Sequence, residues 1–316
     1  MTNSGRASSA RDTAPQPLQD TWRQRLLRVL RQHPGWTTAC LLAPAVLWLC
    51  LLTFVPLGIL AYYSVLTRGP WGTVVHVFTL DNYRQVLDPV FLRVLLRSFR
   101  LAFLTTLVCL GSGYLLAYWI AGGPSSRKPL YLLLVILPFW SSDLVRAYAW
   151  ITLLADHGIV NNSLLALGLI HRPLPLLYNE GAVLLGLVYA YLPFMVLPLY
   201  AAFERLEPAV LEAAADLGAA PVERLVRVVL PLTKGGMLSG SVLVFVPALG
   251  EFLIPELLGG AKTMLLGKFI ALKFTGLRHW PLGAAYALVL VGIITVLVLA
   301  YLRVGGSAEA FQTRKA

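Results

Sequence analysis

Charged side chains are scarce in this sequence of 316 residues, since only 13% are Asp, Glu, Lys or Arg and 58% are hydrophobic. Ordinary soluble domains carry about 25% charged residues, so the composition excludes an ordinary soluble class. The apolar residues gather in long runs, and a helix carries such a run across a bilayer because it satisfies its own backbone hydrogen bonds. We therefore predict an all-α integral membrane protein.

Cysteine and histidine are also few, and neither is spaced for chemistry. Cys40, Cys50 and Cys109 all lie in apolar runs without a Cys-x-x-Cys pair, which argues against a disulfide framework or a thiolate metal site. We expect them to be small buried residues. The five histidines show no metal-ligand spacing, and no Ser/His/Asp or Cys/His set is arranged for catalysis. We predict neither an enzyme nor a metal site.

Six runs are long enough to span a membrane, because about 20 helical residues cross roughly 30 Å of hydrocarbon. They lie at about 39–60, 98–121, 130–154, 182–203, 236–258 and 282–301. Residues 39–303 are then one transmembrane domain of six helices, between an N-terminal tail at 1–38 and a C-terminal tail at 304–316. The N-terminal tail is either an amphipathic helix on the membrane surface or a disordered segment.

The distribution of Lys and Arg predicts the orientation, because cytoplasmic loops retain more of them than translocated loops. The N-terminal tail carries arginines from Arg6 to Arg31, the loop after the second span has Arg127 and Lys128, and the loop at 204–234 has four more basic residues. We predict a multi-pass protein with both termini in the cytoplasm. The net charge of +11 is scattered over loop ends, which favours membrane lipid and not nucleic acid as its partner.

The loop at 204–234, between the fourth and fifth spans, is predicted to fold as two short helices. Residues 208–217 have a helix-forming composition, and Gly218 can end that helix in the left-handed conformation. A second helix over 222–229 has an apolar face and is ended by Pro231. An apolar face in water at a membrane surface suits insertion into a groove on a partner.

At these residues the chain resembles the Glu-Ala-Ala loop of permeases in ATP-binding-cassette (ABC) importers. The residues at the family's spacing are Glu212, Ala213, Ala214, Gly218, Leu230 and Pro231. The resemblance implies the six-helix, MetI-like fold of a type I importer permease. It also implies that the coupling loop, 204–234, sits in a cleft of an ATPase subunit and transmits its closure to the membrane helices.

The chain has no phosphate-binding loop of its own. Gly267 and Lys268 are followed by Phe269, and Lys262 stands where the motif needs its first glycine. With the resemblance, this implies that ATP and Mg are bound by a partner ATPase and that this chain binds no cofactor.

Further segments resemble the permeases of polyamine importers in the bacterial inner membrane, above all those for putrescine, with the spermidine permeases near relatives. They are RAYAW at 146–150, NN at 161–162, VYAYLPFMVLP at 188–198, PLTKGG at 231–236, GEFLIPELLGG at 250–260 and WP at 280–281. The resemblance implies import of putrescine, or of spermidine, by alternating access. It also implies a second homologous permease chain, two ATPase subunits and an external solute-binding protein as partners. An importer of another small solute and an ion-driven secondary carrier are the alternatives, and the coupling loop argues against the carrier.

Acidic residues inside the spans are the candidates for a cation pathway, because ionisable groups in a membrane are costly and usually functional. Glu251 is flanked by Pro247, Gly250 and Pro255, which predicts a broken helix lining a cavity. Asp143 either lines the pathway or pairs with Arg146 three residues later. Glu256, near the end of its span, is either a gate or a solvated interface residue.

Aromatic side chains in the third and fourth spans are candidates to bind ammonium groups through their ring faces. They are Trp140, Tyr148, Trp150, Tyr189 and Tyr191. Each has an alternative interpretation as a residue of the aromatic belt at the membrane surface.

Overall fold

The computed structural model describes residues 34–313, so the amphipathic helix considered for the N-terminal tail lies outside the described residues. The chain divides into two compact units, Met1–Gly58 and Ile59–Ala316. In the first unit lies most of α2 (Pro34–Ser64), an apolar helix in which residues 42–56 are all exposed. Cys50 is therefore exposed, against the expectation of burial, whereas Cys109 of the second unit is buried.

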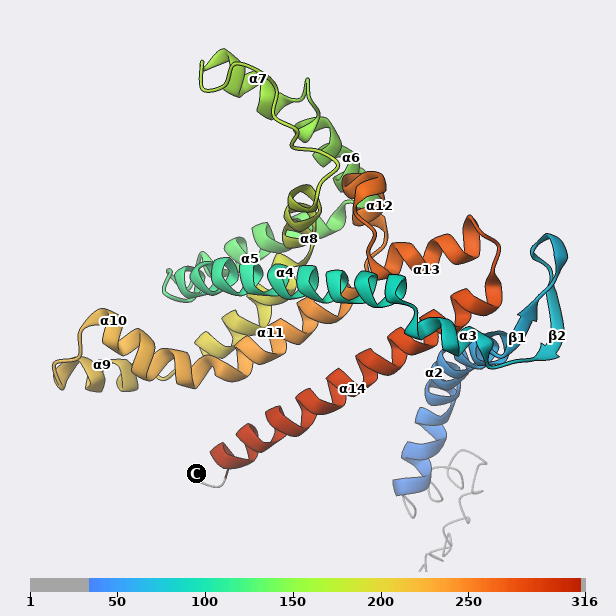
Figure 1. The fold of residues 1–316 in the computed structure, drawn as a ribbon. Coiled ribbons are helices and arrows are strands. Elements are labelled where there is room, and N and C mark those ends of the chain that lie inside the picture. Colours follow the sequence, from blue (N-terminus) through green and yellow to red (C-terminus); the bar gives the residue numbers. More distant parts are fainter. Residues whose placement is uncertain (1–33, 314–316) are drawn as a thin grey trace, which may run out of the picture. The chain divides into compact units, whose positions relative to one another are not determined.

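The core of the second unit is built by three long helices, α4 (Pro89–Ala121), α8 (Glu180–Glu204) and α11 (Leu230–Gly250) (Figure 1). Glycines let these helices approach closely. A Cβ atom at Gly113 of α4 would lie 2.9 Å from Met195 Cγ, and one at Gly240 of α11 would lie 2.7 Å from Met195 Sδ. Met195 of α8 thus fills the space between its two neighbours.

Ion pairs hold α8 at both of its ends. At the first turn, Glu180 pairs with Arg97 at 2.5 Å and with Arg100, both from α4. At the last turn, Glu204 pairs with Lys128 at 2.6 Å, at the start of α5 (Lys128–Ile136). The helix is therefore fixed in position along its axis.

Two of the predicted spans are interrupted. After α5 and a 3-10 turn at Leu137–Trp140, α6 (Asp143–Leu154) and α7 (Ile159–Ala166) continue at 90°. The predicted fifth span, 236–258, combined the end of α11 with a separate helix, α12 (Leu253–Gly259), and the predicted break near Glu251 is present between them. Among the described residues, five helices are long and apolar enough to cross a membrane, or six if the bent pair counts as one span.

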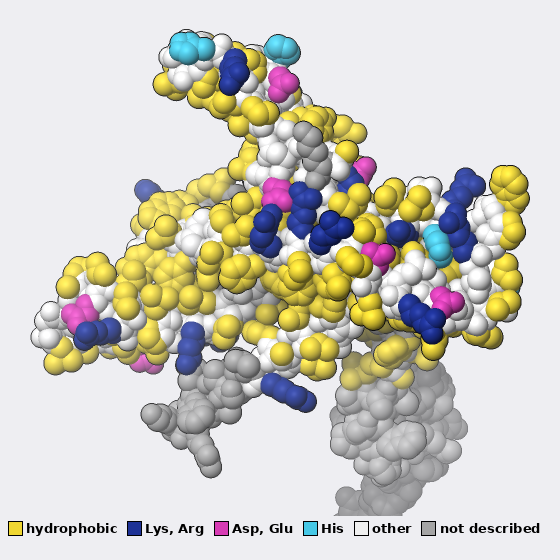
Figure 2. All heavy atoms as spheres, in the orientation of Figure 1, with side chains coloured by type: hydrophobic (Ala, Val, Ile, Leu, Met, Phe, Trp, Pro, Cys, Tyr) yellow, Lys and Arg dark blue, Asp and Glu magenta, His cyan; other side chains and the backbone are white. Residues whose placement is uncertain are grey.

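The chain closes with α13 (Leu266–Thr275) and α14 (Trp280–Thr313). Hydrophobic side chains cover much of the face in Figure 2, and large ones are exposed on several helices, such as Phe103 on α4 and Val296 on α14. Such exposure suits a lipid environment. The all-α fold is broken by a small hairpin, β1 (Leu66–Arg68) and β2 (Val74–Phe78), which is followed by α3 (Asp81–Arg84).

Candidate functional site

The predicted coupling loop folds as two helices joined at a glycine. Helix α9 (Pro208–Asp216) ends before Gly218, whose φ of +83° is the left-handed conformation expected there, and α10 (Pro221–Arg224) follows. A Cβ atom at Gly218 would meet nothing within 4 Å, so this position requires glycine for its backbone conformation and not for space. We call residues 208–229 the elbow.

The elbow leaves apolar side chains uncovered. Leu217 is 89% exposed and Val222 is 72% exposed. Of the predicted coupling residues, Glu212, Ala213 and Pro231 are also exposed, while Ala214 and Leu230 are half-buried. The loop therefore presents the surface that a partner is expected to cover.

The sequence predicted that the second helix of the elbow ends at Pro231, and this prediction is wrong. Residues Leu225–Val229 form a π-helix that leads directly into α11, and Pro231 lies in the first turn of α11. Proline has no N–H, so the α-helical hydrogen bond to the carbonyl of Arg227 is absent, and a wider turn at this point avoids the steric conflict. The elbow is continuous with a core helix.

A buried threonine fixes this junction to the core. The Thr233 hydroxyl donates to the Val229 carbonyl at 2.8 Å and lies 3.2 Å from the hydroxyl of Tyr114 on α4. Val229 and Thr233 are buried. The junction between elbow and membrane helix is thus anchored by packing and by hydrogen bonds.

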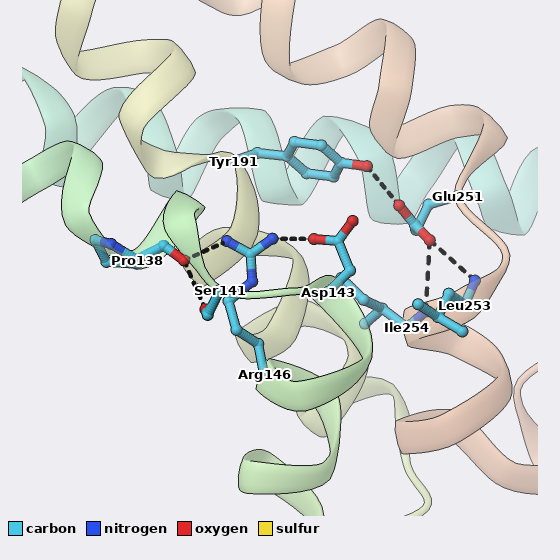
Figure 3. A network of polar contacts seen from close by, with 8 residues as sticks. All are labelled: Pro138, Ser141, Asp143, Arg146, Tyr191, Glu251, Leu253 and Ile254. Carbon is cyan, nitrogen blue, oxygen red and sulfur yellow. Dashed lines mark hydrogen bonds and ion pairs between the residues drawn. The ribbon is translucent and has the colours of Figure 1, made fainter.

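The break between α11 and α12 is organised by Glu251. One carboxylate oxygen accepts the hydroxyl hydrogen of Tyr191 at 2.6 Å, and the other accepts the backbone N–H of Leu253 at 2.9 Å (Figure 3). The carboxylate replaces helical partners for the first N–H groups of α12. Of the predicted aromatic residues, Tyr191 is thus brought into direct contact with the predicted acid.

Asp143 and Arg146 form an ion pair on the first turn of α6. Arg146 also donates from Nη1 to the carbonyl oxygen of Pro138 at 3.1 Å (Figure 3). We call Asp143, Arg146, Tyr191 and Glu251 the polar cluster. Two carboxylates and one guanidinium give it a formal charge of −1, so the cluster favours a cation.

The other predicted pathway residues divide into two groups. Trp150 and Tyr189 pack edge to face, with ring centres 5.5 Å apart, and line a small cavity together with Asp143 and Arg146. Its volume of about 10 Å³ is space for one water molecule. Trp140 and Tyr148 are 76% and 59% exposed and do not line this cavity.

Glu256 has its own partner, which the sequence reasoning missed. Its carboxylate pairs with Lys268 of α13 at 3.0 Å, and Lys268 also donates to the Gly260 carbonyl at 2.7 Å. The pair is not part of the polar cluster. The contact of Phe139 with Arg146, whose Cζ atom lies 5.1 Å from the ring centre, was also missed. Pro138, in the Pro-Phe-Trp-Ser-Ser sequence, is the signal that could have indicated the helix break at this point.

Among the described residues, no group of three His, Cys, Asp or Glu side chains is placed to hold a metal ion. The arrangement instead offers a partly exposed acidic cluster at two helix breaks and an uncovered apolar elbow. The first suits recognition of a cation, and the second suits docking of another protein.

A family model described as "Binding-protein-dependent transport system inner membrane component" matches residues 113–305. The chain belongs to this family. The matched region includes the elbow and the whole polar cluster, so both features lie in the part of the chain that the family shares.

Individual relatives agree with the family. The spermidine/putrescine transport system permease protein PotB of Escherichia coli (strain K12) is 43% identical over 256 residues, which are 81% of this chain and 93% of that protein. The protein of the same name from Haemophilus influenzae is 39% identical, over 81% of this chain and 90% of that protein. A solved bacterial alginate ABC transporter, in complex with a periplasmic protein that holds an alginate pentasaccharide, has a chain with a TM-score of 0.71 and 20% identity, covering 88% of this chain and 96% of that one. This likeness shows the fold of an ABC importer permease.

Proposed function

We propose that this chain is the permease subunit of an ABC importer that carries a polyamine across the bacterial inner membrane. The relatives' names include both spermidine and putrescine, and the sequence resemblance favours putrescine as the preferred cargo. The observation that supports the proposal most is the Glu251 carboxylate, held by Tyr191 at a helix break beside a second carboxylate. A diamine needs carboxylates along its route because each ammonium group loses water there.

Family membership supports an assembly of several subunits. Two ATPase subunits bind ATP and Mg, a second permease chain completes the pathway, and an external solute-binding protein delivers the cargo. Both termini and the elbow lie in the cytoplasm, where Leu217 and Val222 insert into the ATPase. Closure of the ATP-bound subunits opens the pathway outward, and hydrolysis restores the inward state.

The test is uptake of labelled putrescine, competed by spermidine, in cells that lack their own polyamine importers and express the complete complex. Uptake that disappears when this chain is omitted supports a polyamine permease. Absence of uptake by an assembled complex that hydrolyses ATP would show an importer of another solute. Uptake that persists after ATP depletion would indicate a secondary carrier.

A further inference from the structure

The guanidinium of Arg146 is held by the groups that recognise an organic ammonium ion. Its Nη1 atom donates to the Pro138 carbonyl, its Nη2 atom pairs with the Asp143 carboxylate, and its Cζ atom lies 5.1 Å from the centre of the Phe139 ring. A carbonyl, a carboxylate and an aromatic face each attract an alkylammonium ion. Figure 3 shows the guanidinium between Pro138 and Asp143.

The helix break makes these groups available. The 3-10 turn ends at Trp140, and α6 begins at Asp143 after a 90° bend. The Pro138 carbonyl has no α-helical partner. It accepts from the backbone N–H of Ser141 at 3.3 Å and from the Ser141 hydroxyl at 2.8 Å, as well as from Arg146. Irregular backbone of this kind is tolerated at membrane depth where it lines a cavity.

The two members of the ion pair differ in their access. The Arg146 side chain is 11% exposed, whereas the Asp143 side chain is 66% exposed. An approaching cation can thus contact the Asp143 carboxylate before the guanidinium leaves. If an ammonium group of the cargo replaces the guanidinium in this way, the Asp143 carboxylate stays paired throughout. The exchange then avoids the free-energy cost of an unpaired charge.

The second carboxylate of the polar cluster is held by a tyrosine that belongs to a row of aromatic rings. The ring centres of Phe139 and Phe194 are 5.0 Å apart, and those of Phe194 and Tyr191 are 6.2 Å apart. Tyr191 donates to Glu251. Two carboxylates and nearby aromatic rings suit a chain of methylene groups with an ammonium group at each end.

We propose that Pro138, Phe139 and Asp143 form an alkylammonium subsite, which Arg146 occupies when cargo is absent and from which one ammonium group of the cargo displaces it. In the empty permease, the Arg146 guanidinium takes the place of the ammonium group and pairs with the Asp143 carboxylate. This inference rests on the proposed function and adds to it the subsite and its competitor.

The experiment measures equilibrium binding of labelled putrescine to the assembled complex in lipid nanodiscs, without the binding protein. Arg146→Met removes the competing cation but retains an unbranched side chain. We expect the dissociation constant to fall by about tenfold, because one charged hydrogen bond becomes available to the cargo. Asp143→Asn in the same background should reverse the gain, and 1,4-butanediol, which has no charge, should not compete.

Arg84→Met is the matched control. Arg84 pairs with Asp81 across the same three-residue spacing, but both side chains are largely exposed and lie outside the polar cluster. Its dissociation constant should equal that of the wild type. An unchanged constant in assembled Arg146→Met, or an equal gain in Arg84→Met, overturns the proposal.

Two further measurements keep the outcomes separate. If Arg146→Met does not assemble, Asp143→Asn alone decides, because the subsite requires a loss of binding of about tenfold and unchanged binding overturns it. If the wild-type complex neither binds nor imports putrescine, the proposed cargo is wrong. The subsite is then tested with labelled butylammonium, for which Arg146→Met must still bind more tightly than the wild type.

Discussion

The two ends of α11 differ in whether their side chains are covered or hydrogen-bonded within the chain. At the elbow, Leu217 and Val222 are 89% and 72% exposed, so the apolar surface at this end is left uncovered by the chain. At the other end, Glu251 uses both carboxylate oxygens within the chain, with Tyr191 and with the backbone of α12. One end is open to a partner, and the other is completed by the chain itself.

The helix between these ends is suited to carry a displacement. Its 21 residues correspond to about 30 Å of α-helix, and Gly240 and Val244 in its middle are buried against the core. A rigid, packed element moves as a unit. We interpret the elbow as the segment that the ATPase moves, and the break at Glu251 as the place where this movement reaches the pathway.

The largest effect is expected at the closed end, from Glu251→Gln. The amide can still accept from the Leu253 N–H, but it carries no charge for a cation. Uptake of putrescine should fall by at least about tenfold, equal to roughly 1.4 kcal/mol in the barrier. Glu256→Gln is the control, because Glu256 pairs with Lys268 outside the polar cluster, and it should retain more uptake. Equal losses in the two variants would contradict the distinction between these acids.

A second effect is expected at the open end, from Gly218→Ala. The left-handed backbone at Gly218 costs a residue with a Cβ atom about 1–2 kcal/mol, so the elbow should change shape and the ATPase should bind less tightly. Gly235→Ala is the control, since its Cβ atom also meets nothing within 4 Å but its backbone has no positive φ. Co-purification of the ATPase with each variant gives the comparison. If both variants retain the ATPase equally, the elbow does not depend on this conformation.

A smaller effect is expected at the junction, from Thr233→Val. The change removes the hydrogen bonds to Val229 and Tyr114 at nearly constant volume, and it should lower stability by about 1 kcal/mol. Thr275→Val removes a similar bond, to the Ala271 carbonyl, on an exposed part of α13. Thermal unfolding in detergent should separate the two variants, and equal midpoints would show that the buried junction adds nothing.

The smallest effect concerns pH and lies outside the apolar spans. Burial, and then the nearby Arg68 and Lys273, lower the pKa of His279 below its ordinary value of 6.5. The neutral Nδ1 atom accepts the Leu282 N–H at 3.2 Å. A lowered pKa means that the unfolded chain binds the proton more readily, so stability is full above about pH 6.5 and falls as the pH drops below it. His279→Gln should reduce this dependence of the unfolding midpoint, and an unchanged pH profile would contradict the role of His279.

The sequence predicted the elements whose cause is local. Run length predicted the long helices, and Pro247, Gly250 and Pro255 predicted the break at Glu251. The sequence did not predict which aromatic residues line the cavity. Tyr148 and Trp150 are two positions apart on α6, and residues at that spacing do not share a helix face. In the structure it is Trp150 that contacts Tyr189. The pairing of Glu256 with Lys268 was not visible, since it depends on the packing of α13 beside α12.

The most direct measurement follows ATP hydrolysis and putrescine uptake in parallel on one reconstituted complex, for the wild type, Gly218→Ala and Glu251→Gln. If α11 carries the movement of the elbow to the break at Glu251, Gly218→Ala lowers both activities, whereas Glu251→Gln retains hydrolysis stimulated by the binding protein and loses uptake. Normal hydrolysis and normal uptake in Gly218→Ala, at normal expression, would contradict the account.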